Sequence, residues 1–142
     1  MEVKDIPFVI EIENVSFSNP WPESSFRGEI ENYPFSFPYV IVDYRNKRVI
    51  GYIIFWHIND NIQISNIAIH PDYRRKGIAR LLLQRVINSL QKEKVKYITL
   101  EVRPSNLTAQ SLYRKLGFEI IGVKENYYSK PDENAIVMVK SL

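Results

Sequence analysis

The segment from residue 62 to residue 92 constrains the fold more than any other part of the chain. Residues 62–70 read as a strand, Pro71 ends that run, and residues 76–92 carry the strongest amphipathic helix pattern in the sequence. A strand that passes through a short loop directly into such a helix is typical of an α/β layer. The apolar face of the predicted helix consists of Ile78, Leu81, Leu82, Val86, Ile87 and Leu90.

The predicted strand contains an irregularity in its side-chain pattern. Ile62 and Ile64 share one parity, whereas Ile67 and Ile69 share the other. Because successive side chains point to opposite faces of a strand, the apolar face changes sides between the two pairs. A β-bulge near residues 65–66 would absorb the change. A strand buried on both faces is the alternative, since parity then carries little meaning.

The rest of the chain divides into short periodic segments, punctuated by proline, glycine and asparagine. No repeat, linker or low-complexity stretch separates them, so we expect a single domain over residues 1–142. The expected helices are 5–17, about 22–32, and one that Asn106 caps and that runs to about Leu116, where Gly117 stops it. The expected strands are 39–42, 49–58, 97–102, 118–123 and 135–139.

The composition excludes several kinds of site. The 142-residue chain has no cysteine and only two histidines, which excludes a disulfide scaffold, a thiolate zinc site and a cysteine nucleophile, and we expect no metal. No apolar run approaches the roughly 18 residues that span a bilayer. The N-terminal residues lack the pattern of a secretory signal. We therefore expect a soluble cytoplasmic protein that makes no membrane contact, in which His57 and His70 occupy strand-edge or loop positions.

The charges are distributed unevenly. The formal net charge is +3, yet residues 73–92 contain six basic and no acidic side chains, while residues 1–35 contain seven acidic and two basic ones. The mean charge alone would suggest nucleic acid. The distribution instead indicates an anion-binding centre preceded by an acidic segment.

The loop that opens the predicted helix 76–92 has the features of a phosphate-binding site. Gly77 lies where the loop enters the helix, and small Ala79 follows, so the backbone can approach a ligand closely. The free N–H groups of a helix N-terminus attract anions. The spacing matches neither a Walker loop nor a dinucleotide loop. The alternative is an ordinary charged first turn, although basic residues there oppose the helix dipole. The basic side chains are Arg74, Arg75, Lys76 and Arg80.

The stretch Arg74-Arg75-Lys76-Gly77-Ile78-Ala79 resembles the R-x-x-G-x-G/A loop with which GNAT N-acetyltransferases bind acetyl-coenzyme A. Further segments in matching order resemble one type of that family, the ribosomal-protein alanine N-acetyltransferases (RimI type). These segments are 19–26, 66–69, 100–106 with 112–118, and 126–128 before 135–138. The departures are Ala79 in place of the commoner glycine, and Asn134 where an acid often precedes Ala135-Ile136.

The resemblance implies the fold and the donor site. The fold would be a mixed, mostly antiparallel central sheet flanked by about four helices and splayed at a bulged strand. Acetyl-coenzyme A would be the co-substrate, with its pyrophosphate on the backbone of residues 75–80 and its pantetheine arm paired with residues 67–69. Asn106 would contact the coenzyme too, although one side chain cannot easily do this and cap a helix. The residues implied at the coenzyme are Ile67, Ala68, Ile69, Arg74, Arg75, Lys76, Gly77, Ile78, Ala79, Arg80 and Asn106.

Acetyl transfer needs a neutral amine, a base and a proton or hydrogen bond for the leaving thiolate. Glu101 lies on the opposite side of strand 97–102 from its apolar residues and near the C-terminal end, which makes it the best candidate base. The resemblance implies that it takes this role, acting through a water. An ion pair with Arg103 on a solvent-facing strand is the alternative. The resemblance implies that Tyr113 is the proton donor; a core tyrosine is the alternative. Without a cysteine, we expect direct transfer with no acyl-enzyme intermediate.

The resemblance also implies an acceptor, the N-terminal alanine of a small-subunit ribosomal protein, which the acidic side chains of residues 1–35 could attract by their charge. The substrate-binding residues would be Trp21, Glu23, Tyr127 and Tyr128, although Trp21 could simply anchor the core and the tyrosines could simply pack. We expect a monomer or weak dimer without direct nucleic-acid contact. The alternatives are a broader N-terminal or small-amine acetyltransferase, and a non-catalytic nucleic-acid or ribosome-binding module that uses residues 73–92.

Overall fold

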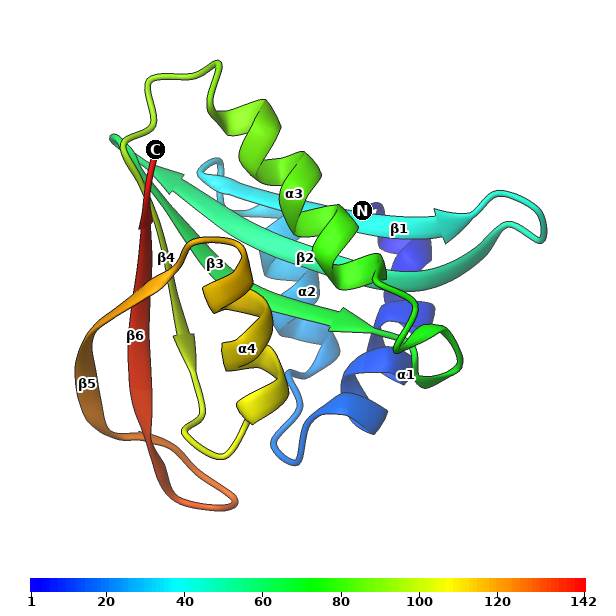
Figure 1. The fold of residues 1–142 in the computed structure, drawn as a ribbon. Helices are drawn as coiled ribbons and strands as arrows, with labels where there is room; N and C mark the ends of the chain where they lie inside the picture. The colour runs from blue at the N-terminus through cyan, green and yellow to red at the C-terminus, as the bar shows by residue number, and fades with distance from the viewer. The chain divides into compact units, whose positions relative to one another are not determined.

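The computed structural model describes residues 1–142, and its elements follow the predicted order (Figure 1). The helices are η1 (Val3–Asp5), α1 (Ile6–Ser16), α2 (Glu23–Glu31), η2 (Pro71–Tyr73), α3 (Ile78–Leu90) and α4 (Leu107–Lys115), where η marks a short 3-10 helix. The strands are β1 (Ser36–Asp43), β2 (Arg48–Ile58), β3 (Asn61–Ile69), β4 (Tyr97–Val102), β5 (Glu119–Tyr128) and β6 (Glu133–Ser141).

The strands form one sheet in the order β1-β2-β3-β4-β6-β5. β1 is antiparallel to β2, and β6 is antiparallel to both β4 and β5. β3 runs parallel to β4, with Asn61–Ile64 opposite Tyr97–Leu100. This arrangement confirms the predicted mixed, mostly antiparallel sheet with four α-helices. The register of β3 is defined up to Ile64, and the bulge expected just beyond it stays a prediction.

The chain divides into two compact units. The first unit contains Met1–His57 and Ser65–Ala79, and the second contains Ile58–Ile64 and Arg80–Leu142. Neither unit is a continuous stretch of chain, so no linker marks the division. The single domain expected over residues 1–142 stays a prediction.

The core of the first unit lies between its helices and its strands. α1 contacts α2, and α2 contacts β1. Phe26 is fully buried and meets the ring of Tyr52 edge-on, with 5.6 Å between the centroids. Gly51 of β2 leaves room for the end of β3, because a Cβ there would lie 2.9 Å from the carbonyl oxygen of Ala68. The buried residues of this core are Ile6, Val9, Ile12, Phe26, Val49, Tyr52, Ile54 and Ala68.

The second unit contains most of the predicted helix 76–92, and its buried face differs from the prediction. Leu83, Ile87 and Leu90 are buried, whereas Leu81 is 56% exposed. The buried positions follow the i, i+4, i+7 spacing of one helix stripe, and residue 81 points away from that stripe. Including Leu81 in the apolar face was therefore wrong, and Leu83 was missed.

The last strands also depart from their predicted bounds. β5 runs to Tyr128, five residues beyond the predicted end at residue 123. Its side chains are mostly exposed, and its register against β6 shifts between Lys124 and Tyr128. Because β5 is an edge strand with little burial, it lacks the apolar alternation by which a strand is predicted. None of the helices has the length and apolar character that a membrane crossing requires.

Candidate active site

The loop between η2 and α3 has the backbone geometry expected of an anion site. Arg75 and Gly77 both adopt positive φ angles, +61° and +74°. A Cβ added to Gly77 would meet no atom within 4 Å, so the backbone there is open to a ligand. α3 begins at Ile78, which puts its N-terminal N–H groups at the same loop. The loop therefore fits the pyrophosphate of a coenzyme. Its side chains of Arg74, Arg75, Lys76 and Arg80 are exposed, and those of Ile78 and Ala79 are half-buried.

Arg74 has a different role from its basic neighbours. Its Nε donates to the carbonyl oxygen of Ile69 at 2.9 Å, and its Nη2 donates to Ser16 Oγ at 2.8 Å. The guanidinium thus ties the loop to the end of β3 and to α1. The exposed side chains of Arg75 and Lys76 are better placed than that of Arg74 to bind an anion. Lys76 Nζ also lies 5.4 Å from the ring centroid of Tyr73.

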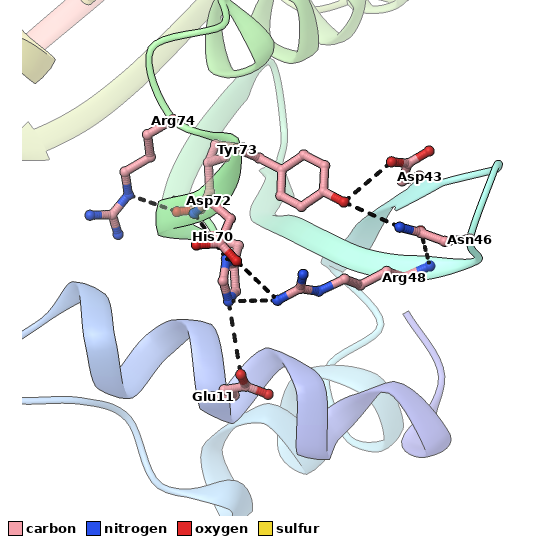
Figure 2. A network of polar contacts seen from close by, with 9 residues as sticks. Glu11, Asp43, Asn46, Arg48, His70, Asp72, Tyr73 and Arg74 are labelled. Carbon is pink, nitrogen blue, oxygen red and sulfur yellow. Dashed lines mark hydrogen bonds and ion pairs between the residues drawn. The ribbon is translucent and has the colours of Figure 1, made fainter.

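A network of polar contacts, seen from close by in Figure 2, braces the start of this loop. His70 is buried; its Nδ1 accepts from the backbone N–H of Asp72 at 3.1 Å, and its Nε2 lies 3.1 Å from Nη2 of Arg48. Glu11 of α1 reaches the same Nε2 at 3.8 Å. His70 lies in the loop after β3, as expected, and the structure also makes it the centre of the network. Its partners Glu11 and Arg48 come from α1 and β2, far away in sequence, so no local pattern could reveal them.

The Tyr73 hydroxyl carries the same network to the β1–β2 hairpin. It donates to Asp43 Oδ2 at 3.3 Å and accepts from Asn46 Nδ2 at 3.4 Å (Figure 2). The Arg45 side chain, by its hydrogen bond to Asp43, holds the pKa of that carboxyl below its usual value. The loop is therefore held by charged and polar contacts on both of its sides within the first unit.

The segment 67–69, expected to pair with pantetheine, lies at the end of β3. Ala68 and Ile69 are buried and Ile67 is half-buried. Just before it, Asn66 Nδ2 donates to Glu13 Oε2 at 3.1 Å and to the Tyr52 hydroxyl at 3.1 Å. The segment thus begins at a residue that is fixed from the core.

The carboxylate of Glu13 holds Asn66, the residue just before this segment, in place. Glu13 is 1% exposed, accepts the backbone N–H of Trp21 at 3.0 Å, and accepts the Tyr52 hydroxyl as well as the Asn66 amide. Burial, and then the Glu13 charge, raise the pKa of Tyr52 far above its usual value. Glu13 was predicted to belong to an acidic surface that attracts a cationic acceptor, and this was wrong because its charge is enclosed and fully hydrogen-bonded.

The same correction applies to Glu29, and the other front acids are only partly free. Glu29 is buried and accepts from Trp56 Nε1 at 2.9 Å. Glu23 and Glu31 are exposed, but Arg27 lies between them at 3.0 and 3.5 Å. The acidic segment therefore presents much less uncompensated charge than its composition suggests. Glu23 stays a candidate acceptor contact, and Trp21 is half-buried against the core with its ring 5.5 Å from that of Phe26.

In the second unit, Glu101 has two partners that the sequence did not indicate. Lys124 Nζ lies 2.6 Å from its Oε1, and Gln63 Nε2 donates to its Oε2 at 2.6 Å. The expected apolar side of β4 is confirmed, because Ile98, Leu100 and Val102 are buried. The alternative of a Glu101–Arg103 pair is wrong. Arg103 instead binds Glu133 and the carbonyl oxygens of residues 129 and 131.

Tyr113 lies on α4 and is 7% exposed, with its ring 5.8 Å from that of Phe118. Burial raises the pKa of its hydroxyl to about 12, so the group stays protonated near neutral pH. Asn106 caps the same helix, since its Oδ1 accepts the N–H of Ala109 at 3.1 Å. The predicted cap is thereby confirmed.

Tyr127 and Tyr128 meet edge-on, with 4.9 Å between their centroids, near the end of β5. Tyr127 is 51% exposed and lies under Lys124 Nζ at 5.3 Å. The Arg103 guanidinium covers the ring of Tyr128 at 4.4 Å. Burial raises the pKa of both hydroxyls. The pair thus offers one packed ring, Tyr128, and one exposed ring, Tyr127, whose neighbour Lys124 binds Glu101.

No group of three side chains of the metal-binding types His, Cys, Asp and Glu converges in the structure.

These features define a class of enzyme that the family comparison also finds. The chain belongs to the GNAT family of acetyltransferases, whose model matches residues 6–118, and the family uses acetyl-coenzyme A as acetyl donor. Among its relatives, the chain is 34% identical over 140 residues to the [ribosomal protein bS18]-alanine N-acetyltransferase of Escherichia coli strain K12. The match covers 97% of this chain and 92% of the relative.

Two further comparisons agree. A protein of Bacillus subtilis named as a putative [ribosomal protein bS18]-alanine N-acetyltransferase is 36% identical over 138 residues, covering 97% of this chain and 90% of the relative. The crystal structure of the ribosomal-protein-S18-alanine N-acetyltransferase from Escherichia coli superposes with a TM-score of 0.89 at 32% identity, covering 99% of this chain and 90% of that chain. The predicted family resemblance is therefore confirmed.

Proposed function

We propose that this protein transfers the acetyl group of acetyl-coenzyme A to a protein N-terminal α-amine, with the N-terminal alanine of ribosomal protein bS18 as its acceptor. The observation that carries the proposal is the identity of 34–36% over 97% of the chain with relatives named for that activity. The proposal places the enzyme in the cytoplasm, where ribosomal proteins are made, and treats residues 1–142 as one catalytic domain.

The donor is held by the loop and the strand end of the first unit. The backbone of residues 75–80 binds the pyrophosphate, supported by the open Gly77 and the start of α3. Residues 67–69 bind the pantetheine arm through main-chain hydrogen bonds. Arg75 and Lys76 add charge, and Asn106 contributes a further contact to the coenzyme. The acceptor is bound by Trp21, Glu23, Tyr127 and Tyr128.

Deprotonation of the acceptor needs only a modest contribution from a general base, because an α-amine has a pKa near 7.7–8.0 and is partly neutral at physiological pH. Glu101 accepts the amine proton, directly or through a water, as the nitrogen attacks the thioester carbon. The new C–N bond forms as the C–S bond breaks, and Tyr113 donates its hydroxyl hydrogen toward the departing sulfur. Tyr113 is protonated near neutral pH, so its hydroxyl has a hydrogen to donate to the sulfur. No covalent enzyme intermediate forms.

A peptide panel tests the proposal. The purified protein is incubated with acetyl-coenzyme A and peptides that copy the N-terminus of bS18, that begin with Met or Ser, or that carry a blocked N-terminus, and with spermidine and an aminoglycoside. Mass spectrometry should detect acetylation of the Ala-initiated bS18 peptide first. Reaction of the polyamine or aminoglycoside without any peptide reaction would replace the proposal with a small-amine activity.

A binding measurement tests the remaining alternative, a non-catalytic nucleic-acid module. Coenzyme A that binds the native state raises the melting temperature by mass action, equivalent to about 2.7 kcal/mol at a ligand concentration of 100 Kd. We expect this shift with coenzyme A and none with a short RNA. Stabilisation by RNA alone would support the module and contradict the acetyltransferase.

A further inference from the structure

Lys124 places an ammonium group directly on the carboxylate that we propose as the base. Its Nζ lies 2.6 Å from Oε1 of Glu101, and its side chain is 52% exposed while that of Glu101 is only 11% exposed. The lysine therefore reaches the carboxylate from the solvent side. An exposed partner of this kind can leave the carboxylate without opening the core.

The second oxygen of Glu101 has a different kind of partner. Gln63 Nε2 donates to Oε2 at 2.6 Å, and the Gln63 carbonyl oxygen accepts from Thr99 Oγ1 at 2.6 Å. Thr99 thereby fixes the orientation of the amide, and the amide fixes one side of the carboxylate. Oε2 is held by the fixed Gln63 amide, and Oε1 is the oxygen bound by the more exposed partner, Lys124.

The position of Lys124 Nζ has the chemistry that an N-terminal ammonium requires. A carboxylate oxygen lies at hydrogen-bond distance from it, and the centroid of the exposed Tyr127 ring lies 5.3 Å from it. A protein α-ammonium carries the same single charge and the same three N–H donors as a lysine ammonium. The Glu101 hydrogen bond raises the pKa of Lys124, so its side chain is a cation throughout the physiological range.

We propose that Lys124 is an internal stand-in for the acceptor: its ammonium occupies the subsite at Glu101 Oε1 that receives the acceptor's N-terminal ammonium, and the acceptor binds by displacing it. The inference rests on the proposed role of Glu101 in the transferase. It implies a specificity filter, because an uncharged or blocked N-terminus cannot replace the lysine at the carboxylate. In the wild type, the acceptor must first break the Lys124–Glu101 ion pair, so this ion pair weakens acceptor binding. It does not slow the chemical step.

Lys124→Met tests this by removing the charge and keeping the length of the side chain. At saturating acetyl-coenzyme A we expect the KM for the bS18 peptide to fall about threefold to fivefold, the scale of a partly exposed ion pair. The kcat should change by less than about twofold, since only ground-state binding is altered. Lys124→Arg restores the cation and should restore the wild-type KM. Lys96→Met, which removes a surface lysine paired with Asp60 at 3.1 Å, is the matched control and should leave the KM unchanged.

A blocked peptide separates charge displacement from a general change of the groove. The inhibition constant of the N-acetylated bS18 peptide should be the same for wild type and Lys124→Met, because that peptide has no ammonium to place at Glu101. An unchanged or higher KM for the free peptide in Lys124→Met, or an equal gain for the blocked peptide, would overturn the inference. Failure of the base role is a separate result: it would appear as an undiminished kcat in Glu101→Gln.

Discussion

The backbone N–H of Trp21 donates to Oε1 of Glu13 at 3.0 Å, so a buried carboxylate holds the turn between α1 and α2. The same carboxylate accepts from Tyr52 and Asn66 and therefore joins the front helices to β3. A helix glutamate between Ile12 and Asn14 would ordinarily be expected at the surface. Here it is the hydrogen-bond acceptor on which two candidate substrate-binding segments depend.

Replacement of Glu13 by glutamine should destabilise the protein by about 1–3 kcal/mol, since the amide NH₂ would face donors and leave buried groups unsatisfied. The free energy of unfolding from denaturant titration measures the effect. Glu11→Gln on the same helix is the control, because the Glu11 side chain is 63% exposed and its change should be near zero. Equal stability of the two variants would contradict the role assigned to Glu13.

Gly51→Ala should move the end of β3. The added methyl would lie 2.8 Å from Ile69 Cδ1 and 2.9 Å from the Ala68 carbonyl oxygen, contacts that require the backbone to shift. We expect a loss of about 1–3 kcal/mol of stability, as for overpacking in a core, together with weaker coenzyme A binding. Gly122→Ala, whose added methyl would meet nothing within 4 Å, should leave both quantities unaffected.

The catalytic assignments predict a separation of turnover from donor binding. Glu101→Gln and Tyr113→Phe should each lower kcat by about 10²–10⁴-fold, the usual contribution of a positioned acid or base. The dissociation constant of coenzyme A, measured by calorimetry, should stay within error of the wild type. A variant that retains full kcat would lose its catalytic assignment.

Tyr113 also predicts how stability depends on alkaline pH. Its folded-state pKa is raised from the usual 10 to about 12 by burial, so the folded state retains the proton longer than the unfolded chain does. Its contribution is fully present below pH 10 and is lost as the pH rises toward about 12. Tyr113→Phe should therefore lose about 1–3 kcal/mol less stability than the wild type across that interval. Urea midpoints measured from pH 8 to pH 12 give the comparison, and parallel curves would contradict the buried hydroxyl.

The residues that sequence reasoning found and missed differ in how local their signals are. Helix caps and positive φ angles depend on a few neighbouring residues, so they could be predicted from sequence. The examples are Asn106, Gly117 and the loop around Gly77. The apolar side of β4 was also predictable from alternation alone. Glu101 and Arg103 are two positions apart in sequence and looked like natural partners, but Glu101 pairs with Lys124 on β5, two strands away in the sheet.

The burial of charged side chains also could not be predicted from the sequence. Composition places Glu13 and Glu29 among surface acids, and only the fold brings Tyr52 and Trp56 to them as donors. Leu81 and Leu83 illustrate the same point for apolar residues, since a leucine-rich turn leaves the direction of the buried stripe open until its packing partners are known. Local constraints thus predicted the cap of α4 and the loop before α3, while the partners of the buried acids came from distant parts of the chain.

The cap at the start of α4 divides one side chain between two tasks. Asn106 gives its carbonyl oxygen to the helix, so only its amide hydrogens remain for a ligand. A side chain restricted in this way can recognise oxygen acceptors such as those of a phosphate or an amide, and it discriminates against donors. The capping role and the proposed coenzyme contact, which one side chain could not easily combine, would thus use opposite ends of the same group. Asn106→Asp would preserve the first and abolish the second.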